Sequence, residues 1–162
     1  MFHIKSAQRS GAPALAAIKV NGNFPENVVR RKLPTIQGFV ALLDAECGCV
    51  LALVDSIEIT ARRTAAATAL AAKYLAKPGS RRLAMIGCGV QACYHVEALL
   101  DVAPIETVAF CEPRDEAAER FAGRMGELGL RARRAGDVRA AVRSADIVVT
   151  LTTSTRPLLG LA

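Results

Sequence analysis

The stretch Arg82-Leu83-Ala84-Met85-Ile86-Gly87-Cys88-Gly89-Val90-Gln91-Ala92 decides the fold, because an apolar run breaks into Gly-x-Gly-x-x-Ala and then continues as a helical pattern. A strand that turns tightly into a helix in this way builds a phosphate-binding site. Gly87 permits the turn, Gly89 lets the backbone approach a pyrophosphate, and Ala92 lets helix and strand pack closely. The free N–H groups and the positive end of the helix then face the anion.

The downstream sequence favours a dinucleotide site over a purely structural glycine turn. A second apolar strand, Thr107–Cys111, ends at Glu112, about twenty-five residues past Gly87. A carboxylate in this place suits the hydroxyls of an adenosine ribose, for which the usual spacing is about twenty residues. Glu112 favours NAD over NADP because it would repel a 2′-phosphate, whereas Arg114 is placed to attract one.

Length and composition describe a globular protein. The 162 residues are 52% hydrophobic, no apolar run reaches the roughly eighteen residues of a membrane span, and the N-terminus lacks the apolar stretch of a secretory signal. We therefore expect a cytoplasmic protein without a membrane partner. The net charge of +6 comes largely from arginines interleaved with acidic residues, and aromatic residues make up 4%. This pattern favours solvated helix faces and attraction for an anionic cofactor over nucleic-acid binding.

The five cysteines predict reduced thiols and no metal site. Their number is odd, and they form neither a repeated CxxC pattern nor a cluster with histidine. Cys47-Gly48-Cys49 follows turn residues between two apolar strands, so a turn is favoured over metal binding. Cys88 and Cys93 flank the expected helix N-terminus, which predicts a lowered thiol pKa at both positions.

Residues 1–56 predict an antiparallel domain. They read as strands at Ala16–Val20, Ile36–Leu43 and Val50–Val54, with a turn at Asn21–Asn23. We interpret this segment as a partial α+β domain for substrate binding and dimerisation.

A connecting helix and a regular alternation of strands and helices follow. Ile57–Ala76 is rich in alanine and stops at Lys77-Pro78-Gly79, so residues 57–79 are expected to connect two domains. Residues 80–162 predict an α/β, Rossmann-type, doubly wound parallel sheet. The expected strands are Leu83–Ile86, Val108–Cys111, Leu130–Arg133 and Ala145–Leu151, and the expected helices are Val90–Leu100, Glu116–Leu128 and Val138–Arg143.

Charged residues in apolar surroundings mark two further positions, because such a charge is costly unless it has a partner. Lys19 lies inside an apolar strand, where a functional site, an exposed strand edge or a stem that extends its charge to water explains it. Arg62 and Arg63 are adjacent in the Ala-rich helix and point about 100° apart, so they cannot share one face.

Five ordered motifs resemble those of the ornithine cyclodeaminase and mu-crystallin family, over nearly the entire chain. They are Lys19–Asn27, Leu33–Gly38, Ala61–Ala67, Gly87–Ala92 and Ala145–Thr150. The resemblance implies a homodimeric NAD(P)-dependent enzyme that acts by hydride transfer at the α carbon of a small amino or imino acid. It favours ornithine cyclodeamination to proline and ammonia, with alanine dehydrogenase, ketimine reductase or pyrroline-2-carboxylate reductase as alternatives. A non-catalytic, crystallin-like dinucleotide-binding protein is an alternative of another class.

The resemblance also implies roles for individual residues. Lys19 lies beside the substrate as the catalytic residue, and Arg63 pairs with the substrate carboxylate, which suits a bidentate guanidinium. The residues implied at the cofactor are Thr64, Gly87, Gly89, Val90, Gln91, Glu112, Arg114, Thr152, Thr153 and Ser154. Family members continue through further strands and supply an aspartate, so the chain is expected to be a fragment, truncated at both ends and inactive alone.

Overall fold

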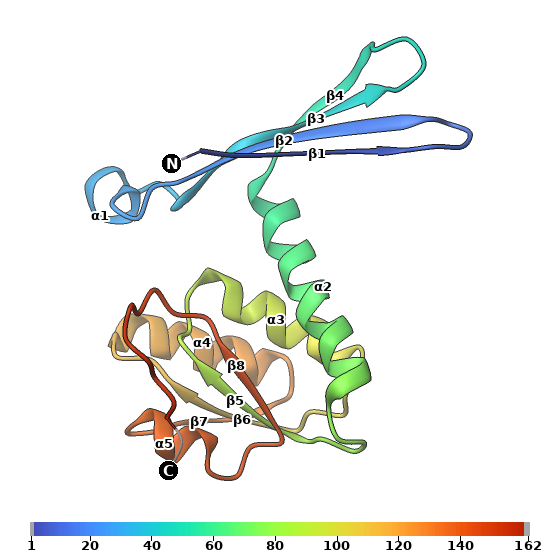
Figure 1. Cartoon of the computed structure of the whole chain (residues 1–162). Coiled ribbons are helices and arrows are strands. Elements are labelled where there is room, and N and C mark those ends of the chain that lie inside the picture. Colours follow the sequence, from blue (N-terminus) through green and yellow to red (C-terminus); the bar gives the residue numbers. More distant parts are fainter. Residues whose placement is uncertain (1, 161–162) are drawn as a thin grey trace. The chain divides into compact units, whose positions relative to one another are not determined.

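The computed structural model describes residues 2–160, which form two compact units that divide between Thr60 and Ala61 (Figure 1). The division falls inside one long helix, α2 (Ile57–Leu75). An antiparallel sheet comes first in the chain and a parallel sheet second. The predicted fold class is therefore confirmed.

The first unit is an antiparallel sheet of four strands in the order β1-β2-β3-β4. The strands are β1 (Phe2–Arg9), β2 (Leu15–Asn23), β3 (Ile36–Asp44) and β4 (Val50–Asp55), and a short helix, α1 (Asn27–Arg31), follows β2. Lys19 lies opposite Lys5 on β1 and Val40 on β3. It therefore belongs to a central strand, so the exposed-edge explanation of this lysine is wrong.

Strand β2 runs further than the sequence pattern predicts. Asn21–Asn23, expected as a turn, continues the strand, and Asn21 lies opposite both His3 and Gly38. A Cβ atom at Gly38 would stand only 2.0 Å from the carbonyl oxygen of Val20. The missing side chain of Gly38 thus lets β2 and β3 approach each other beside this segment.

The expected turn before Cys49 is confirmed. The Asp44 carboxylate accepts hydrogen bonds from the N–H groups of Glu46, at 2.7 Å, and Cys47, at 3.2 Å. Gly48 has a φ of +76°, a left-handed conformation that glycine adopts without strain. These bonds hold the turn between β3 and β4 and account for the turn residues found there.

The second unit is a parallel sheet in the order β7-β6-β5-β8. Its strands are β5 (Arg82–Ile86), β6 (Thr107–Cys111), β7 (Arg131–Arg134) and β8 (Ile147–Thr150), and its helices are α3 (Val90–Leu100), α4 (Asp115–Glu127) and α5 (Val138–Val142). Each agrees with its predicted range to within two residues. Because the strand order reverses between β5 and β8, the carboxyl ends of these two strands border the crevice where such sheets bind ligands.

Helices cover both faces of the parallel sheet, as a doubly wound fold requires (Figure 1). Met85 and Phe110 face α3 and α4, and the Phe110 ring meets the edge of Phe121 with 5.1 Å between ring centroids. Ile86 faces the other way and packs with Ala141 of α5. Adjacent strand residues point to opposite faces, so Met85 and Ile86 serve two separate cores.

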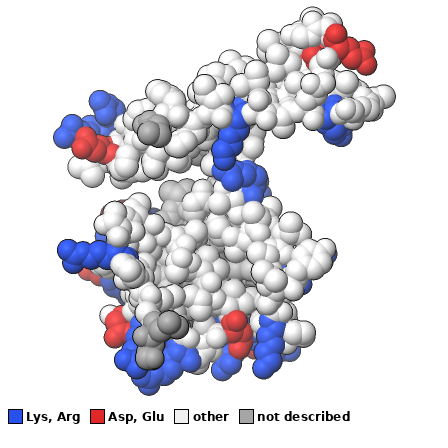
Figure 2. Space-filling view, in the orientation of Figure 1, with Lys and Arg blue, Asp and Glu red and all other residues white. Residues whose placement is uncertain are grey.

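Charged side chains are spread over the surface and many are paired. Figure 2 shows basic side chains at several separate places, with acidic side chains among them. Arg124 pairs with Glu97 and with Glu127, and Arg120 pairs with Glu116. Among residues 2–160, no helix is long and apolar enough to cross a membrane.

Replacing Gly38 with alanine should destabilise the first unit by about 2 kcal/mol, because the added methyl group overpacks the backbone of β2. Hydrogen exchange would report the change as lost amide protection in β2 and β3. Gly123→Ala is the matched control, because a Cβ atom there meets nothing within 4 Å and alanine favours the helix. Unchanged protection in Gly38→Ala would contradict the close approach.

Candidate dinucleotide-binding site

Gly87 ends β5 and makes the turn towards α3. Its φ is +88°, and a Cβ atom would stand 2.5 Å from the carbonyl oxygen of Leu151, which follows β8. Its N–H donates to the carbonyl of Cys111 at 2.9 Å. The contacts around Gly87 therefore join the ends of β5, β6 and β8, and the fold alone requires glycine there.

Gly89 differs from Gly87, because its own unit does not require glycine. Its φ of −72° suits any residue, and an added Cβ atom would meet nothing within 4 Å. Among residues 2–160, no acceptor is found for the N–H groups of Gly89, Val90 and Gln91. Open space in front of unpaired N–H groups at the start of an 11-residue helix fits a pyrophosphate.

The carboxylate of Glu112 lies directly after β6 and is only 3% exposed. Its Oε2 accepts hydrogen bonds from the Cys88 N–H at 2.8 Å and from Nη2 of Arg114 at 3.2 Å. Its Oε1 accepts from the N–H and from Nε of Arg114, at 3.1 and 2.8 Å. The structure thus brings the glycine turn, Glu112 and Arg114 together, as one site requires.

The hydrogen bonds to Glu112 keep it ionised. The Arg114 guanidinium and the N–H groups of Cys88 and Arg114 outweigh the effect of burial and lower the pKa of Glu112 to about 2. The same pairing raises the pKa of Arg114. Glu112 therefore presents a negative charge at every pH at which the protein is expected to work.

The prediction of lowered thiol pKa values is wrong. Burial, followed by the negative charge of Glu112, raises the pKa of Cys88 to about 12. Burial also raises the pKa of Cys93. Both side chains pack in the core instead of facing the N–H groups of α3, so the thiolate form gains nothing from the helix end.

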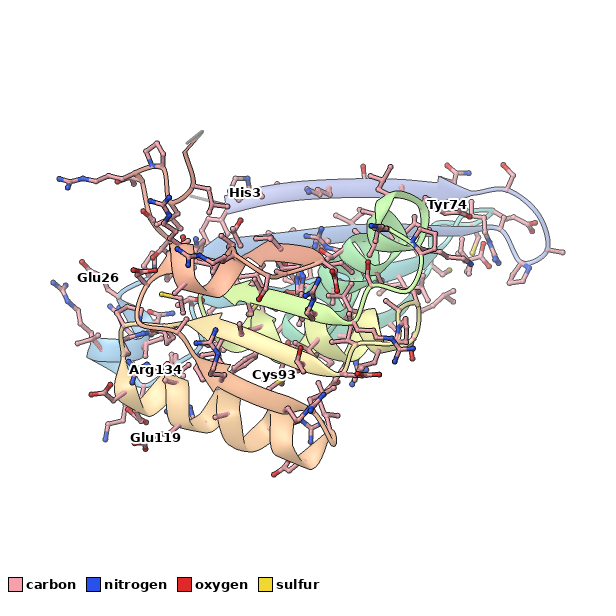
Figure 3. The ribbon with its side chains drawn as sticks, turned by 90° about the horizontal axis from the view of Figure 1, so that it is seen from below. His3, Glu26, Tyr74, Cys93, Glu119 and Arg134 are labelled. Atoms are coloured by element: carbon pink, nitrogen blue, oxygen red, sulfur yellow. The ribbon has the colours of Figure 1, made fainter. Side chains whose placement is uncertain are left out.

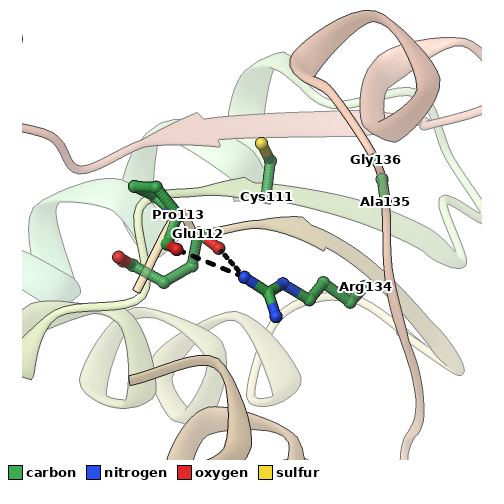
Figure 4. A pocket seen from close by; sticks show the side chains of 6 residues that line it. All are labelled: Cys111, Glu112, Pro113, Arg134, Ala135 and Gly136. Carbon is green, nitrogen blue, oxygen red and sulfur yellow. Dashed lines mark hydrogen bonds between the residues drawn. The ribbon is translucent and has the colours of Figure 1, made fainter. Parts of the chain in front are cut away.

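A pocket of about 380 Å³ opens beside Glu112 at the carboxyl ends of β6 and β7 (Figure 4). It is lined by Cys111, Glu112, Pro113, Arg134, Ala135 and Gly136. Nη2 of Arg134 donates to the carbonyls of Glu112, at 2.8 Å, and Pro113, at 3.4 Å. Sequence analysis missed Arg134, because the pattern Arg131–Arg134 gives no sign that one arginine turns back over the preceding strand.

Arg134 also pairs with Asp115 on the first turn of α4, with 2.7 Å between Nη1 and Oδ1. Figure 3 shows Arg134 near one end of α4 and Glu119 on the outer side of that helix, pointing away from the sheet. Glu112 and Pro113, whose carbonyls Arg134 binds, immediately precede α4. Arg134 thereby ties the end of β7 to the turn that carries Glu112.

The segment after β8 reaches the glycine turn through Thr152 as well as Leu151. The methyl group of Thr152 lies 2.9 Å from the place where a Cβ atom of Gly87 would stand. Ser154 is held within its own loop, since its N–H donates to Thr152 and its hydroxyl donates to the carbonyl of Arg156. Thr153 is exposed.

Lys19 has a defined partner within the first unit. Its Nζ lies 3.4 Å from the hydroxyl of Thr60, to which Nδ2 of Asn21 also donates at 3.0 Å. Lys19 and Asn21 are two residues apart on β2 and so share one face of the sheet. Sequence analysis did not identify Thr60 as their common partner.

The two adjacent arginines of α2 have different surroundings in the second unit. The Arg62 guanidinium lies 5.8 Å from the ring centroid of Tyr94 on α3. Arg63 is exposed, and within the described part of the chain no hydrogen bond or ion pair of its guanidinium is found. Thr64 is half-buried on the same helix.

Comparison with known proteins agrees with this geometry. A model described as the ornithine cyclodeaminase/mu-crystallin family matches residues 6–160. The chain is 43% identical over 128 residues to L-lysine cyclodeaminase of Streptomyces rapamycinicus, an alignment that covers 79% of this chain and 37% of that protein. The chain spans less than half the length of the curated relatives it matches.

Two solved structures share most of this fold. One, a lysine cyclodeaminase described for its recognition of L-lysine, L-ornithine and L-2,4-diamino butyric acid, is 33% identical, with a TM-score of 0.84 over 97% of this chain and 46% of that chain. The other, Thermococcus litoralis Delta(1)-pyrroline-2-carboxylate reductase in complex with NADH and L-proline, is 28% identical, with a TM-score of 0.86 over 98% of this chain and 54% of that chain.

Glu112→Gln should lower the free energy of unfolding at neutral pH by about 2 kcal/mol, because the charge-assisted bonds to Arg114 and Cys88 are lost. The pKa of Glu112 is lowered from 4.5 to about 2, so its stabilising effect is complete above 4.5 and disappears as the pH falls towards 2. Chemical denaturation between pH 7 and pH 2 should show the free energies of unfolding of the wild type and Glu112→Gln becoming equal as the pH falls. Glu119→Gln, an exposed control on α4, should change stability little at any pH.

Proposed function

Because the chain belongs to the ornithine cyclodeaminase/mu-crystallin family, we propose that it binds NAD and acts in hydride transfer at the α carbon of a small amino or imino acid. One observation carries the proposal: an ionised, buried Glu112 bonded to the glycine turn, beside the open space at Gly89. The unpaired N–H groups of Gly89, Val90 and Gln91 would receive the pyrophosphate. The pocket lined by Cys111 and Arg134 has room for the adenine ring.

We propose NAD as the preferred cofactor and NADP as the weaker one. The Glu112 carboxylate can accept hydrogen bonds from ribose hydroxyls and repels a 2′-phosphate. Thr152 lies against the glycine turn and is the best-supported contact from the segment after β8. Thr64, Thr153 and Ser154 are proposed as further cofactor contacts on the family resemblance.

For the reaction we propose cyclodeamination of a diamino acid, L-ornithine giving L-proline and ammonia. The 43% identity to an L-lysine cyclodeaminase supports this class of substrate. When bound, the cofactor would supply the acceptor for a hydride from the α carbon and the source of the hydride that the cyclic product needs. The chain's own residues would bind and orient the amino acid and hold its protons.

Lys19 and Arg63 are the proposed substrate residues. Lys19 is proposed as the catalytic residue, because it is a half-buried residue on a central strand, where a charge without a use is costly. Arg63 is proposed to bind the substrate carboxylate through two parallel hydrogen bonds. Its exposed guanidinium, with no partner found among the described residues, supports that role.

A one-step reductase is the second candidate function. The likeness to a Delta(1)-pyrroline-2-carboxylate reductase with NADH and L-proline favours it. Such an enzyme would need no acid for a distal amine, so substrate tests separate it from a cyclodeaminase. NADH binding without turnover of any amino or imino acid would instead favour a crystallin-like binding protein.

We also propose a homodimer for the whole protein. The sheet of the first unit leaves several large apolar side chains exposed, which is typical of surfaces that meet a partner. They are Phe2, Ile4, Val50, Leu51 and Leu53.

Gly89→Val should abolish NADH binding, because its side chain fills the space assigned to the pyrophosphate. The variant should keep its stability, since the added atoms meet open space in the free protein. Calorimetric titration with NADH and a thermal melt together test both statements. An unchanged NADH affinity would show that the phosphate lies elsewhere.

Arg63→Lys should lower kcat/KM for the amino or imino acid by roughly 10- to 100-fold, because a point charge cannot reproduce a bidentate carboxylate contact. In the whole protein, turnover of L-ornithine would be followed as ammonia and proline formed, because that reaction regenerates NAD, and turnover of L-alanine and pyrroline-2-carboxylate would be followed by NADH absorbance. Arg62→Lys is the matched control on the adjacent residue and should remain near normal. Equal values for the two variants would remove Arg63 from the substrate site.

A further inference from the structure

We infer that Arg114 is a displaceable competitor of the adenosine ribose, and that its release from Glu112 sets the affinity for NAD and the discrimination against NADP. The inference rests on the proposed function, because it concerns the same cofactor site.

Glu112 has no vacant acceptor position. A carboxylate offers about four lone-pair sites. In the structure, Oε1 accepts two hydrogen bonds, both from Arg114, and Oε2 accepts one from the Cys88 N–H and one from Arg114. A ribose hydroxyl therefore reaches the carboxylate only if one of these donors leaves.

The Arg114 guanidinium is the donor that can leave. The N–H of Cys88 belongs to the buried glycine turn, and the N–H of Arg114 belongs to the residue that precedes the first turn of α4, so both are fixed by the backbone. The Arg114 side chain, in contrast, is 67% exposed and can rotate into water. It occupies two acceptor positions at once, through Nε and Nη2. Two neighbouring ribose hydroxyls can replace that pair of bonds.

The exchange has opposite consequences for the two cofactors. NAD binding breaks the ion pair between Arg114 and Glu112 before the ribose hydroxyls can bond to the carboxylate, so Arg114 weakens the binding of NAD. With NADP, the released guanidinium is next to the 2′-phosphate and offsets the repulsion from Glu112. Arg114 thus narrows the preference for NAD that Glu112 creates.

Arg114→Met tests the inference, because it keeps an apolar stem and removes all the guanidinium donors. The NADH dissociation constant should fall about three- to fivefold, the value of a partly exposed ion pair, while that of NADPH should rise. Arg120→Met, on α4 and paired with Glu116, is the matched control for the loss of one positive charge. It should weaken both cofactors slightly and equally.

Thermal melts supply a second readout. Without cofactor, Arg114→Met should melt at a lower temperature than the wild type, because Glu112 loses its counter-charge. NADH should then raise the melting temperature of Arg114→Met by more than it raises that of the wild type. Arg114→Lys keeps the charge without the paired bonds, so it should change NADH affinity in the same direction by a smaller factor, even if Arg114→Met does not fold.

Two outcomes would overturn these statements and are distinguishable. If the wild type binds NADH but neither Arg114 variant binds it more tightly than Arg120→Met does, Arg114 does not compete with the ribose. If the wild type does not bind NADH, the proposed cofactor site is wrong and the inference fails with it.

Discussion

The hydrogen bond from the Cys88 N–H to the Glu112 carboxylate is the interaction on which the rest of the second unit's proposed binding edge depends. It joins two turns that are 24 residues apart in the chain. The bond from the Gly87 N–H to the Cys111 carbonyl lies beside it, and the contact of Gly87 with Leu151 adds the end of β8. Three parallel strands thus end at one place, with the start of α3 facing outward.

This arrangement gives Glu112 two tasks that compete. In the free protein, two backbone N–H groups and a guanidinium donate hydrogen bonds to the carboxylate. These bonds offset the desolvation cost of burying its charge and hold the turn in place. In the proposed complex the same oxygens must serve a ribose. The exposed Arg114 reconciles the two tasks, since the fixed N–H groups keep the carboxylate in position while the mobile group is exchanged.

The two glycines of the turn separate folding from binding. Gly87 adopts a left-handed conformation against the Leu151 carbonyl, so its own unit accounts for it completely. Gly89 has an ordinary φ and open space in front of it, and no described residue of the unit requires its small size. Of the two, only Gly89 points to an absent ligand, although the motif places both within three residues.

The sequence by itself determined the parallel sheet and the place of the glycine turn. Buried parallel strands are continuous apolar runs, and glycine, proline and charged residues mark the ends of helices. The local sequence pattern was therefore sufficient to predict these elements. It was not sufficient in the first unit. Strand β1 has no buried residue, α1 has only five residues, and Asn21–Asn23 forms a strand because Gly38 lies opposite.

Only the tertiary structure decided what surrounds the chemical groups. The pattern located Glu112 and Arg114 but not the three hydrogen bonds between them, and it predicted the wrong direction for the thiol pKa of Cys88. It also missed Arg134 as a pocket residue. The reason is physical: burial and hydrogen bonds between turns depend on segments brought together by the sheet, whereas strand and helix patterns depend on neighbours along the chain.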